Sequence, residues 1–190
     1  MDREATLALF RRAGALLEGH FKLSSGLHSG GYLQCALVLQ NPTDAAALGA
    51  AIAARSSAVQ AQVVLSPALG GVIIGHEVAR ALGVRAIFAE RADGALTLRR
   101  GFSLSPGERV LVVEDVVTTG GSTAETIEVA RRAGADVVGA AAIIDRSGGA
   151  ARLPVSLHAL AQLSLPTYEV SACPLCAQGL PVTKPGSRAT

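Results

Sequence analysis

Two adjacent acids, Glu114 and Asp115, follow the apolar run Val110–Val113 and precede a loop of small and hydroxyl-bearing residues, Val116-Val117-Thr118-Thr119-Gly120-Gly121-Ser122. The apolar run predicts a buried strand, and ligands in open α/β sheets bind at the carboxyl ends of the strands. Carboxylates repel a phosphate, but they suit the two vicinal hydroxyls of a ribose or a hydrated Mg²⁺. This segment is therefore the first candidate for chemistry.

The loop after the acids leads into a helix predicted over residues 124–133. Free amide N–H groups and the positive dipole end at a helix start suit a phosphate, and the two glycines allow close approach. The hydroxyls of Thr118, Thr119 and Ser122 add donors. We interpret residues 114–122 as a holder for a ribose 5-phosphate. The simpler interpretation is a tight strand-to-helix turn with a solvated acid pair, and the combination of two acids with this loop weighs against it.

Two common phosphate-binding motifs are absent. A Walker loop needs a lysine after its glycines, and no lysine lies between positions 23 and 183. The dinucleotide fingerprint G-x-G-x-x-G does not occur, since Gly70-Gly71-Val72-Ile73-Ile74-Gly75 has a different spacing. The sequence therefore gives no support to a Walker-type or dinucleotide site.

Composition limits the class of protein. The chain has 190 residues, of which 49% are hydrophobic, so one domain with an aliphatic core is expected. The net charge of +2 favours neither nucleic acid nor a membrane as partner. No apolar run approaches the ~18 residues of a membrane span. The first residues lack the features of a secretory signal, and three cysteines do not make a disulfide framework, so we expect a cytoplasmic protein.

Strand and helix patterns alternate through the middle of the chain. Apolar runs predict strands at 63–65, 86–89, 110–113 and 137–144. The segments between or before them predict helices over 42–56, 72–82 and 124–133. This alternation is typical of an α/β fold, with a central parallel sheet flanked by helices. Residues 90–108 interrupt it as a long excursion that resembles a hairpin.

The two ends of the chain follow another pattern. Apolar spacing over residues 3–18 predicts a helix ending at Gly19, and short strands are predicted at 21–23 and 32–35. We expect one domain over residues 1–190. Within this domain, about residues 41–150 form the core. About residues 1–40, together with the tail after about residue 150, form a small hood.

The stretch Val110–Thr123 resembles the phosphoribosyl-diphosphate (PRPP) signature of the type I phosphoribosyltransferases, which has four apolar residues, two acids, two apolar residues and a Thr/Gly/Ser loop. Other segments are similar to elements of the orotate phosphoribosyltransferases within that family. They are Phe21-Lys22-Leu23-Ser24-Ser25-Gly26, the turn Pro67-Ala68-Leu69-Gly70-Gly71, the strand end Ile143-Ile144-Asp145-Arg146, and the tail Cys173-Pro174-Leu175-Cys176 with residues 184–188, which resembles a bacterial subgroup.

The resemblance implies a type I phosphoribosyltransferase fold with a small hood subdomain. It implies transfer of ribose 5-phosphate from PRPP to orotate, which yields orotidine 5′-phosphate and diphosphate in pyrimidine (UMP) synthesis. It also implies Mg²⁺, bound mainly through PRPP without an assigned protein ligand, and a homodimer with active sites near its interface. The implied PRPP-binding residues are Glu114, Asp115, Val116, Val117, Thr118, Thr119, Gly120, Gly121, Ser122, Ala68, Leu69, Gly70, Gly71 and Arg91.

The same resemblance assigns orotate to Thr118, Arg146, Ser24, Ser25 and Gly26. A guanidinium fits a carboxylate in a two-bond grip. The alternatives are an ion pair of Arg146 with Asp145 or Glu169, a helix cap for Thr118, and a plain hairpin turn for residues 24–26.

Residues 91–100 resemble the family's catalytic loop, and the implied catalytic residues are Glu114, Asp115, Arg91, Arg99 and Arg100. Well-known members carry lysines and a histidine in this loop, whereas this sequence has neither. Arginine supplies positive charge for a diphosphate but does not act as a general acid. The alternative for these arginines is a solvated charged face.

Two other functions stay open at this stage. One is a phosphoribosyltransferase for another base, and the other is a non-catalytic regulator that senses PRPP. An acidic pyrimidine needs a cation such as Arg146, and a regulator that binds nucleic acid would need a basic strip. Cys173 and Cys176 supply only half of a four-cysteine zinc site, so we interpret them as ordinary turn residues; the alternative is a metal site whose second pair comes from a symmetry-related subunit. His28 is placed near the base pocket, and His20 shows no ligand spacing.

Overall fold

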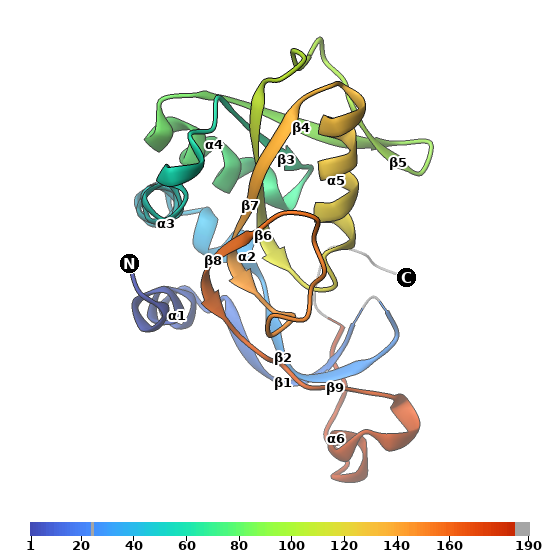
Figure 1. Cartoon of the computed structure of the whole chain (residues 1–190). Coiled ribbons are helices and arrows are strands. Elements are labelled where there is room, and N and C mark those ends of the chain that lie inside the picture. Colours follow the sequence, from blue (N-terminus) through green and yellow to red (C-terminus); the bar gives the residue numbers. More distant parts are fainter. Residues whose placement is uncertain (24, 185–190) are drawn as a thin grey trace.

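The computed structural model describes residues 1–23 and 25–184, and its elements form two sheets with helices around them (Figure 1). The helices are α1 (Arg3–Arg12), α2 (Cys35–Leu39), α3 (Pro42–Arg55), α4 (Gly70–Leu82), α5 (Gly121–Arg132) and α6 (Pro174–Ala177). The strands are β1 (Leu16–Lys22), β2 (His28–Leu33), β3 (Val63–Pro67), β4 (Arg85–Ala92), β5 (Ala95–Leu98), β6 (Arg109–Val117), β7 (Asp136–Asp145), β8 (Leu157–Gln162) and β9 (Thr167–Tyr168). Short 3₁₀ helices occupy Ser57–Val59 and Val170–Ala172.

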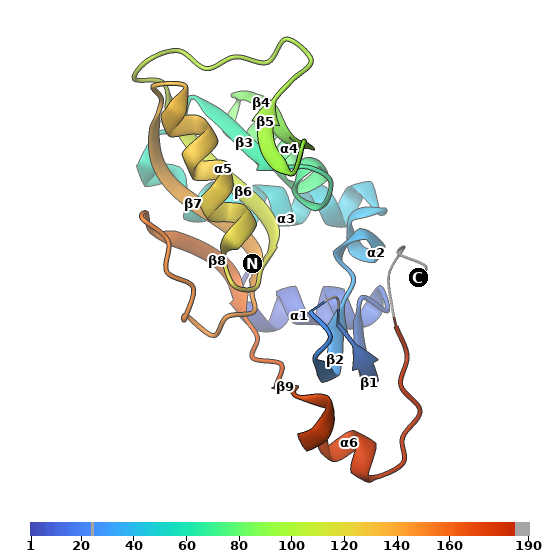
Figure 2. The same ribbon diagram turned by 90° about the vertical axis from the view of Figure 1, so that its right-hand side faces the viewer.

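The larger sheet contains all the strands that the apolar runs predict. Its order is β5-β4-β3-β6-β7-β8, and every neighbouring pair is parallel except β4 with β5. β3 is buried along its whole length, which requires cover on both faces. α3 and α4 lie on one face and α5 on the other, as Figures 1 and 2 show. The predicted α/β class with a central, mostly parallel sheet is confirmed.

The connections change direction between β3 and β6. The chain runs from β3 through α4 to β4 toward one edge of the sheet, and from β6 through α5 to β7 toward the other edge. Such a reversal opens a crevice at the carboxyl ends of the two strands, where ligands bind in open α/β sheets. β3 ends at Pro67 and β6 at Val117. The loops that follow them are the two that the sequence assigns to PRPP.

The predicted helix over residues 3–18 is too long. α1 ends at Arg12 because Gly14 adopts a φ of +63°, in the left-handed region that commonly terminates helices. Leu16 and Leu17 instead begin β1 and pair with Leu33 and Tyr32 of β2. Apolar spacing missed the break because leucines lie on both sides of Gly14 at distances that also fit a helix. The strand predicted at 32–35 ends at Leu33, and Cys35 begins α2.

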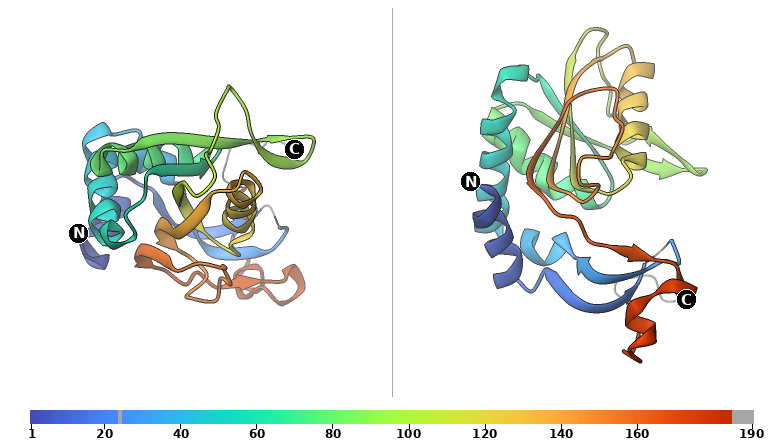
Figure 3. Two further views of the ribbon diagram at one scale, coloured as in Figure 1. Left: turned by 45° about the horizontal axis from the view of Figure 1, so that its top comes forward. Right: turned by 60° about the horizontal axis from the view of Figure 1, so that its bottom comes forward.

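The tail after residue 150 contributes to both sheets. β8 pairs with β7 in the larger sheet, and β9 pairs with β2 in the smaller sheet, whose order is β1-β2-β9. Figure 3 shows the chain passing from one sheet to the other. Residues 157–162 therefore lie in the larger sheet, although the expected hood includes them.

The excursion at 90–108 begins with a β-hairpin. β4 and β5 pair antiparallel around Asp93 and Gly94, whose φ values are +51° and +84°. Positive φ at both central residues is the geometry of the tight turn that Asp-Gly favours.

None of the helices in the described part of the chain is both long and apolar enough to cross a membrane.

Candidate active site

Glu114 and Asp115 lie near the carboxyl end of β6, as the sequence predicts. Glu114 is only 6% exposed, and the Ser122 hydroxyl donates a 2.8 Å hydrogen bond to one of its carboxylate oxygens. The half-buried Asp115 accepts a 2.9 Å bond from the amide of Val116. The acid pair is thus tied to its own strand and to the first turn of α5.

Burial makes full ionisation of this pair unfavourable. Loss of hydration and then repulsion from Asp115 raise the pKa of Glu114 to about 8. Burial also raises the pKa of Asp115, and hydrogen bonds from backbone amides oppose that shift. Hydroxyl donors or a cation would favour the ionised form. Oxygen ligands are also those that Mg²⁺ prefers, so the two acids fit ribose hydroxyls together with a magnesium ion held by a phosphorylated substrate.

The loop between β6 and α5 exposes a helix start. Gly120 is the N-cap of α5 with a φ of +84°, a backbone conformation that favours glycine, and it has no side chain to cap the helix. The Thr119 hydroxyl accepts one long hydrogen bond, 3.4 Å, from the Gly121 amide. Thr118 and Thr119 are exposed beside it. Within the described residues the amides of Ser122 and Thr123 have no side-chain partner, and together with the positive dipole end they form a place for an anion.

A second uncapped helix start faces the acids from β3. α4 begins at Gly70, and no side chain of the described chain caps it. A Cβ at Gly70 would lie 2.8 Å from both carboxylate oxygens of Asp115, so only glycine fits there without a shift. The preceding residue, Leu69, is 85% exposed. The structure therefore brings the turn at residues 68–71 into contact with the acid doublet.

Arg146 lies beside this loop at the end of the neighbouring strand. β7 pairs with β6 up to Asp145 opposite Val117, and the Arg146 amide donates a 2.8 Å bond to the Val117 carbonyl. Partial burial lowers the pKa of the guanidinium, and the nearby Tyr32 of β2 raises it. Tyr32 was not among the residues predicted for the site, and its position after the N-terminal element Phe21–Gly26 was the available signal.

The Arg146 guanidinium forms no ion pair within residues 1–23 and 25–184. The Asp145 carboxylate instead accepts bonds from the amide and hydroxyl of Ser147 and from the amide of Gly149. The alternative of an Arg146–Asp145 ion pair is thus not what the structure shows, and a partly buried cation is left for a ligand.

Ser25 and Gly26 belong to the loop between β1 and β2, and Ser24 lies outside the described residues. Gly26 has a φ of +88°, and its amide bonds to the Leu23 carbonyl at 3.0 Å. Because the Gly26 amide is used by this hydrogen bond within the turn, a ligand would have to bind to other polar groups of the loop. Contact of this loop with orotate stays a prediction.

The three arginines of the excursion are exposed. Arg91 pairs with Glu125 of α5 at 2.8 Å, and Arg100 pairs with Glu90 at 2.7 Å. Arg99 has no ion pair within the described residues. Two of the three arginines therefore form ion pairs with acids on the surface of the chain, which agrees with the alternative of a solvated charged face.

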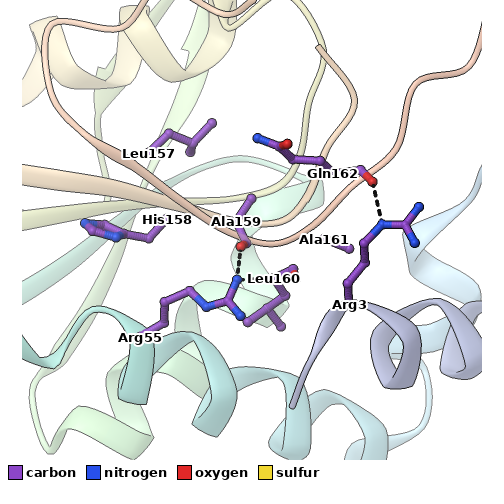
Figure 4. A pocket seen from close by; sticks show the side chains of 8 residues that line it. All are labelled: Arg3, Arg55, Leu157, His158, Ala159, Leu160, Ala161 and Gln162. Carbon is purple, nitrogen blue, oxygen red and sulfur yellow. Dashed lines mark hydrogen bonds between the residues drawn. The ribbon is translucent and has the colours of Figure 1, made fainter. Parts of the chain in front are cut away.

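The hollow drawn in Figure 4 is a different feature. It has a volume of about 390 Å³ and is lined by β8 together with Arg3 and Arg55. Arg55 donates to the carbonyls of Ala159 and Leu160, and Arg3 donates to the carbonyl of Gln162. The two side chains cover the free edge of the sheet, which protects it from pairing with another chain. The hollow shares no residue with the predicted site.

One cluster was missed from the sequence. His20 and His28 lie together with Cys173 and Cys176, although spacing had given His20 no ligand role and had left the cysteines as turn residues. A pair of histidines eight residues apart and a distant C-x-x-C match no common ligand spacing. Only the pairing of β1 with β2 and the return of the tail bring them together.

Comparison with known proteins agrees with this fold and site. The profile of the phosphoribosyl transferase domain matches residues 38–156, which include both helix starts and the acid doublet. Fold and site therefore define a phosphoribosyltransferase.

Full-length relatives narrow the class. The orotate phosphoribosyltransferases of Pelotomaculum thermopropionicum and Desulforamulus reducens are each 53% identical over 188 residues, covering 99% of this chain and 99% and 98% of theirs. The crystal structure of Mycobacterium tuberculosis orotate phosphoribosyltransferase in complex with PRPP has a TM-score of 0.70 at 25% identity and covers 86% of this chain and 97% of that one. The chain belongs to the orotate phosphoribosyltransferase family, whose members are glycosyltransferases.

Proposed function

We propose that this chain transfers the 5-phosphoribosyl group of PRPP to orotate, with orotidine 5′-phosphate and diphosphate as products, in pyrimidine synthesis. One observation carries the proposal: an acid doublet, with Glu114 buried and Asp115 partly buried, stands between two helix starts whose N-cap residues supply no side-chain cap, at the point where the sheet changes direction. This arrangement suits a sugar that carries a phosphate at one end and a diphosphate at the other.

The donor would bind through groups that the fold already orients. The amides and hydroxyls of residues 118–122 would hold the 5-phosphate, and Glu114 and Asp115 would accept bonds from the ribose hydroxyls. The turn at residues 68–71 would face the diphosphate. Mg²⁺, bound mainly through PRPP, would offset the diphosphate charge as it leaves.

The reaction needs positioning more than proton transfer. The bond from C1 of the ribose to the diphosphate breaks and a bond from C1 to N1 of orotate forms, so positive charge develops on the ribose ring. Ionised Glu114 and Asp115 would stabilise that charge, Glu114 from a buried position. Glu114 must then lose its proton when the donor binds.

Arg146 supports orotate as the acceptor. Its backbone bonds to Val117, the residue before Thr118, and its guanidinium forms no ion pair with a carboxylate of the described chain. A two-bond contact with the orotate carboxylate would satisfy it, whereas a neutral purine would leave a half-buried cation without a partner. Ser24, Ser25 and Gly26 would present backbone and hydroxyl donors to the edge of the orotate ring.

The arginines at 91, 99 and 100 would bring positive charge to the diphosphate. We propose a cytoplasmic homodimer in which this loop lies near the neighbouring subunit's site. The resemblance of residues 91–100 to the catalytic loop of the family supports this arrangement. Sedimentation of the purified chain at micromolar concentration tests for the dimer.

The activity is tested by the fall in orotate absorbance with PRPP and Mg²⁺. Uracil, adenine and hypoxanthine serve as alternative acceptors, and Asp115→Asn is compared with Glu128→Gln, an exposed acid on α5. We expect turnover of orotate alone, a lower kcat/KM for PRPP in Asp115→Asn and full activity in Glu128→Gln. Turnover of a purine instead, or binding of PRPP with no turnover of any base, would overturn the proposal.

A further inference from the structure

Four ligand-type side chains meet at one point on the smaller sheet. They are His20 of β1, His28 of β2, and Cys173 and Cys176 of the tail, and their ligand atoms all lie within 4.8 Å of one another. The two histidines and Cys173 are buried. None of the four belongs to the proposed active site, and no role in the transfer reaction uses them.

The separations are close to those of a tetrahedral metal site. The His20 Nε2 atom is 2.8 Å from His28 Nδ1, 3.6 Å from Cys173 Sγ and 3.7 Å from Cys176 Sγ, and Cys176 Sγ is 3.3 Å from His28 Nδ1. Ligands around zinc lie about 3.3 Å apart for two nitrogens and about 3.6 Å apart for nitrogen and sulfur, as its bond lengths require. Small shifts of the side chains would therefore complete a Cys₂His₂ tetrahedron.

The tautomer of His20 is also suited to a metal. Its Nδ1 atom lies 2.8 Å from the carbonyl oxygen of Leu180, which only accepts hydrogen bonds. The proton of a neutral His20 must then be on Nδ1, so that Nε2 presents its lone pair to the cluster. Ligating histidines commonly have such a carbonyl partner on the other ring nitrogen.

The tail needs an anchor at this place. The 3₁₀ helix Val170–Ala172 and α6 contain no buried residue, and Val170, Leu180 and Val182 are 54%, 44% and 49% exposed. Figures 1 and 2 show α6 beyond the smaller sheet, away from the larger one. Backbone bonds join Thr183 to His20 and Lys22. Apolar burial alone contributes little here, and small units of this kind are commonly held by a structural metal.

We propose that His20, His28, Cys173 and Cys176 bind one zinc ion, which fastens residues 169–183 to the β1–β2 hairpin. Two thiolates with two imidazoles are a typical zinc set, and four protein ligands leave no open position, so the site is structural. Binding releases the two thiol protons to solvent, and the two thiolates balance the charge of the ion. The C-x-x-C thus finds its second pair of ligands in its own chain.

Metal analysis of the full-length chain tests this. After incubation with zinc and desalting, we expect one zinc per chain, and cobalt in its place should give the absorption bands of a tetrahedral thiolate site. Cys176→Ser and His28→Gln should lower the zinc content at least about tenfold. The matched controls Cys35→Ala and His158→Gln should retain it.

A second measurement does not depend on how the variants fold. Chelation of the wild-type chain should speed proteolytic cleavage within residues 169–183, and added zinc should restore resistance. Three results would each overturn the proposal: no retained zinc in the wild-type chain, equal zinc in Cys176→Ser and Cys35→Ala, or a Cys173–Cys176 disulfide in the chain purified without oxidant.

Discussion

The backbone of Gly70 lies against the carboxylate of Asp115, so closely that a methyl group at Gly70 would come within 2.8 Å of both carboxylate oxygens. This contact joins the turn proposed for the diphosphate to the acids proposed for the ribose. The two halves of the donor site are therefore set by one packing relationship between α4 and β6.

Gly70→Ala should impair use of PRPP because the side chain must displace Asp115. We expect kcat/KM for PRPP to fall at least about tenfold, equal to about 1.4 kcal/mol of lost transition-state binding. Steady-state kinetics measures this. Gly139→Ala is the control, since a Cβ there would make only ordinary contacts, the nearest at 3.6 Å. Equal kinetics in both variants would count against the contact.

Asp115→Asn should raise the KM for PRPP, by roughly tenfold to a hundredfold, because an amide binds ribose hydroxyls less strongly than a carboxylate does. The KM for orotate should change little. Titration of PRPP at saturating orotate, and the reverse, separates the two. An effect confined to orotate would show that Asp115 does not face the donor.

Glu114 should make stability fall as pH rises. Its pKa in the folded chain, about 8, lies above the ordinary value of 4.5, so the folded state binds more protons between these pH values. The free energy of unfolding should then decrease from pH 5 to pH 8, by on the order of a few kcal/mol. Glu114→Gln should remove this decrease. Urea unfolding of wild type and variant at pH 5 and pH 8 measures this change. An equal decrease in the free energy of unfolding in both proteins would disprove the assignment.

Arg146→Ala should raise the KM for orotate by roughly 10- to 100-fold, because the variant loses the charged hydrogen bonds to the orotate carboxylate. Arg146→Lys should restore the charge but not the two-bond geometry, and should therefore rescue only part of the affinity. Arg131→Ala, which removes an exposed ion pair with Glu128, serves as control. If PRPP kinetics alone respond, the base pocket lies elsewhere.

Arg99→Ala should lower kcat more than Arg91→Ala does, since the Arg91 charge is already paired with Glu125. If the loop serves the neighbouring subunit, mixing Arg99→Ala chains with Asp115→Asn chains should raise the activity at PRPP concentrations far below KM, where both variants are impaired. The rise should approach roughly a quarter of wild-type activity, because half of the random dimers contain one intact site. Absence of recovery, with mixed dimers verified, would place the loop over its own site.

Several structural elements of this protein could be predicted from short stretches of its sequence. The apolar run before Glu114, the two acids and the Gly-containing loop define a strand, a ligand edge and a helix start, because each depends on residues that are neighbours in the chain. The Asp-Gly turn of the β4–β5 hairpin and the α/β alternation are of the same local kind.

Tertiary structure alone decided the rest. The end of α1 at Arg12 depends on the backbone of Gly14, which apolar spacing does not register. β8 joins the larger sheet because β7 has an open edge, although its own sequence resembles a loop-rich tail. His20 and His28 come to Cys173 and Cys176 across more than 140 residues, through strand pairing and the return of the tail. Contacts between distant segments are set by packing of the whole chain, and no local pattern encodes them.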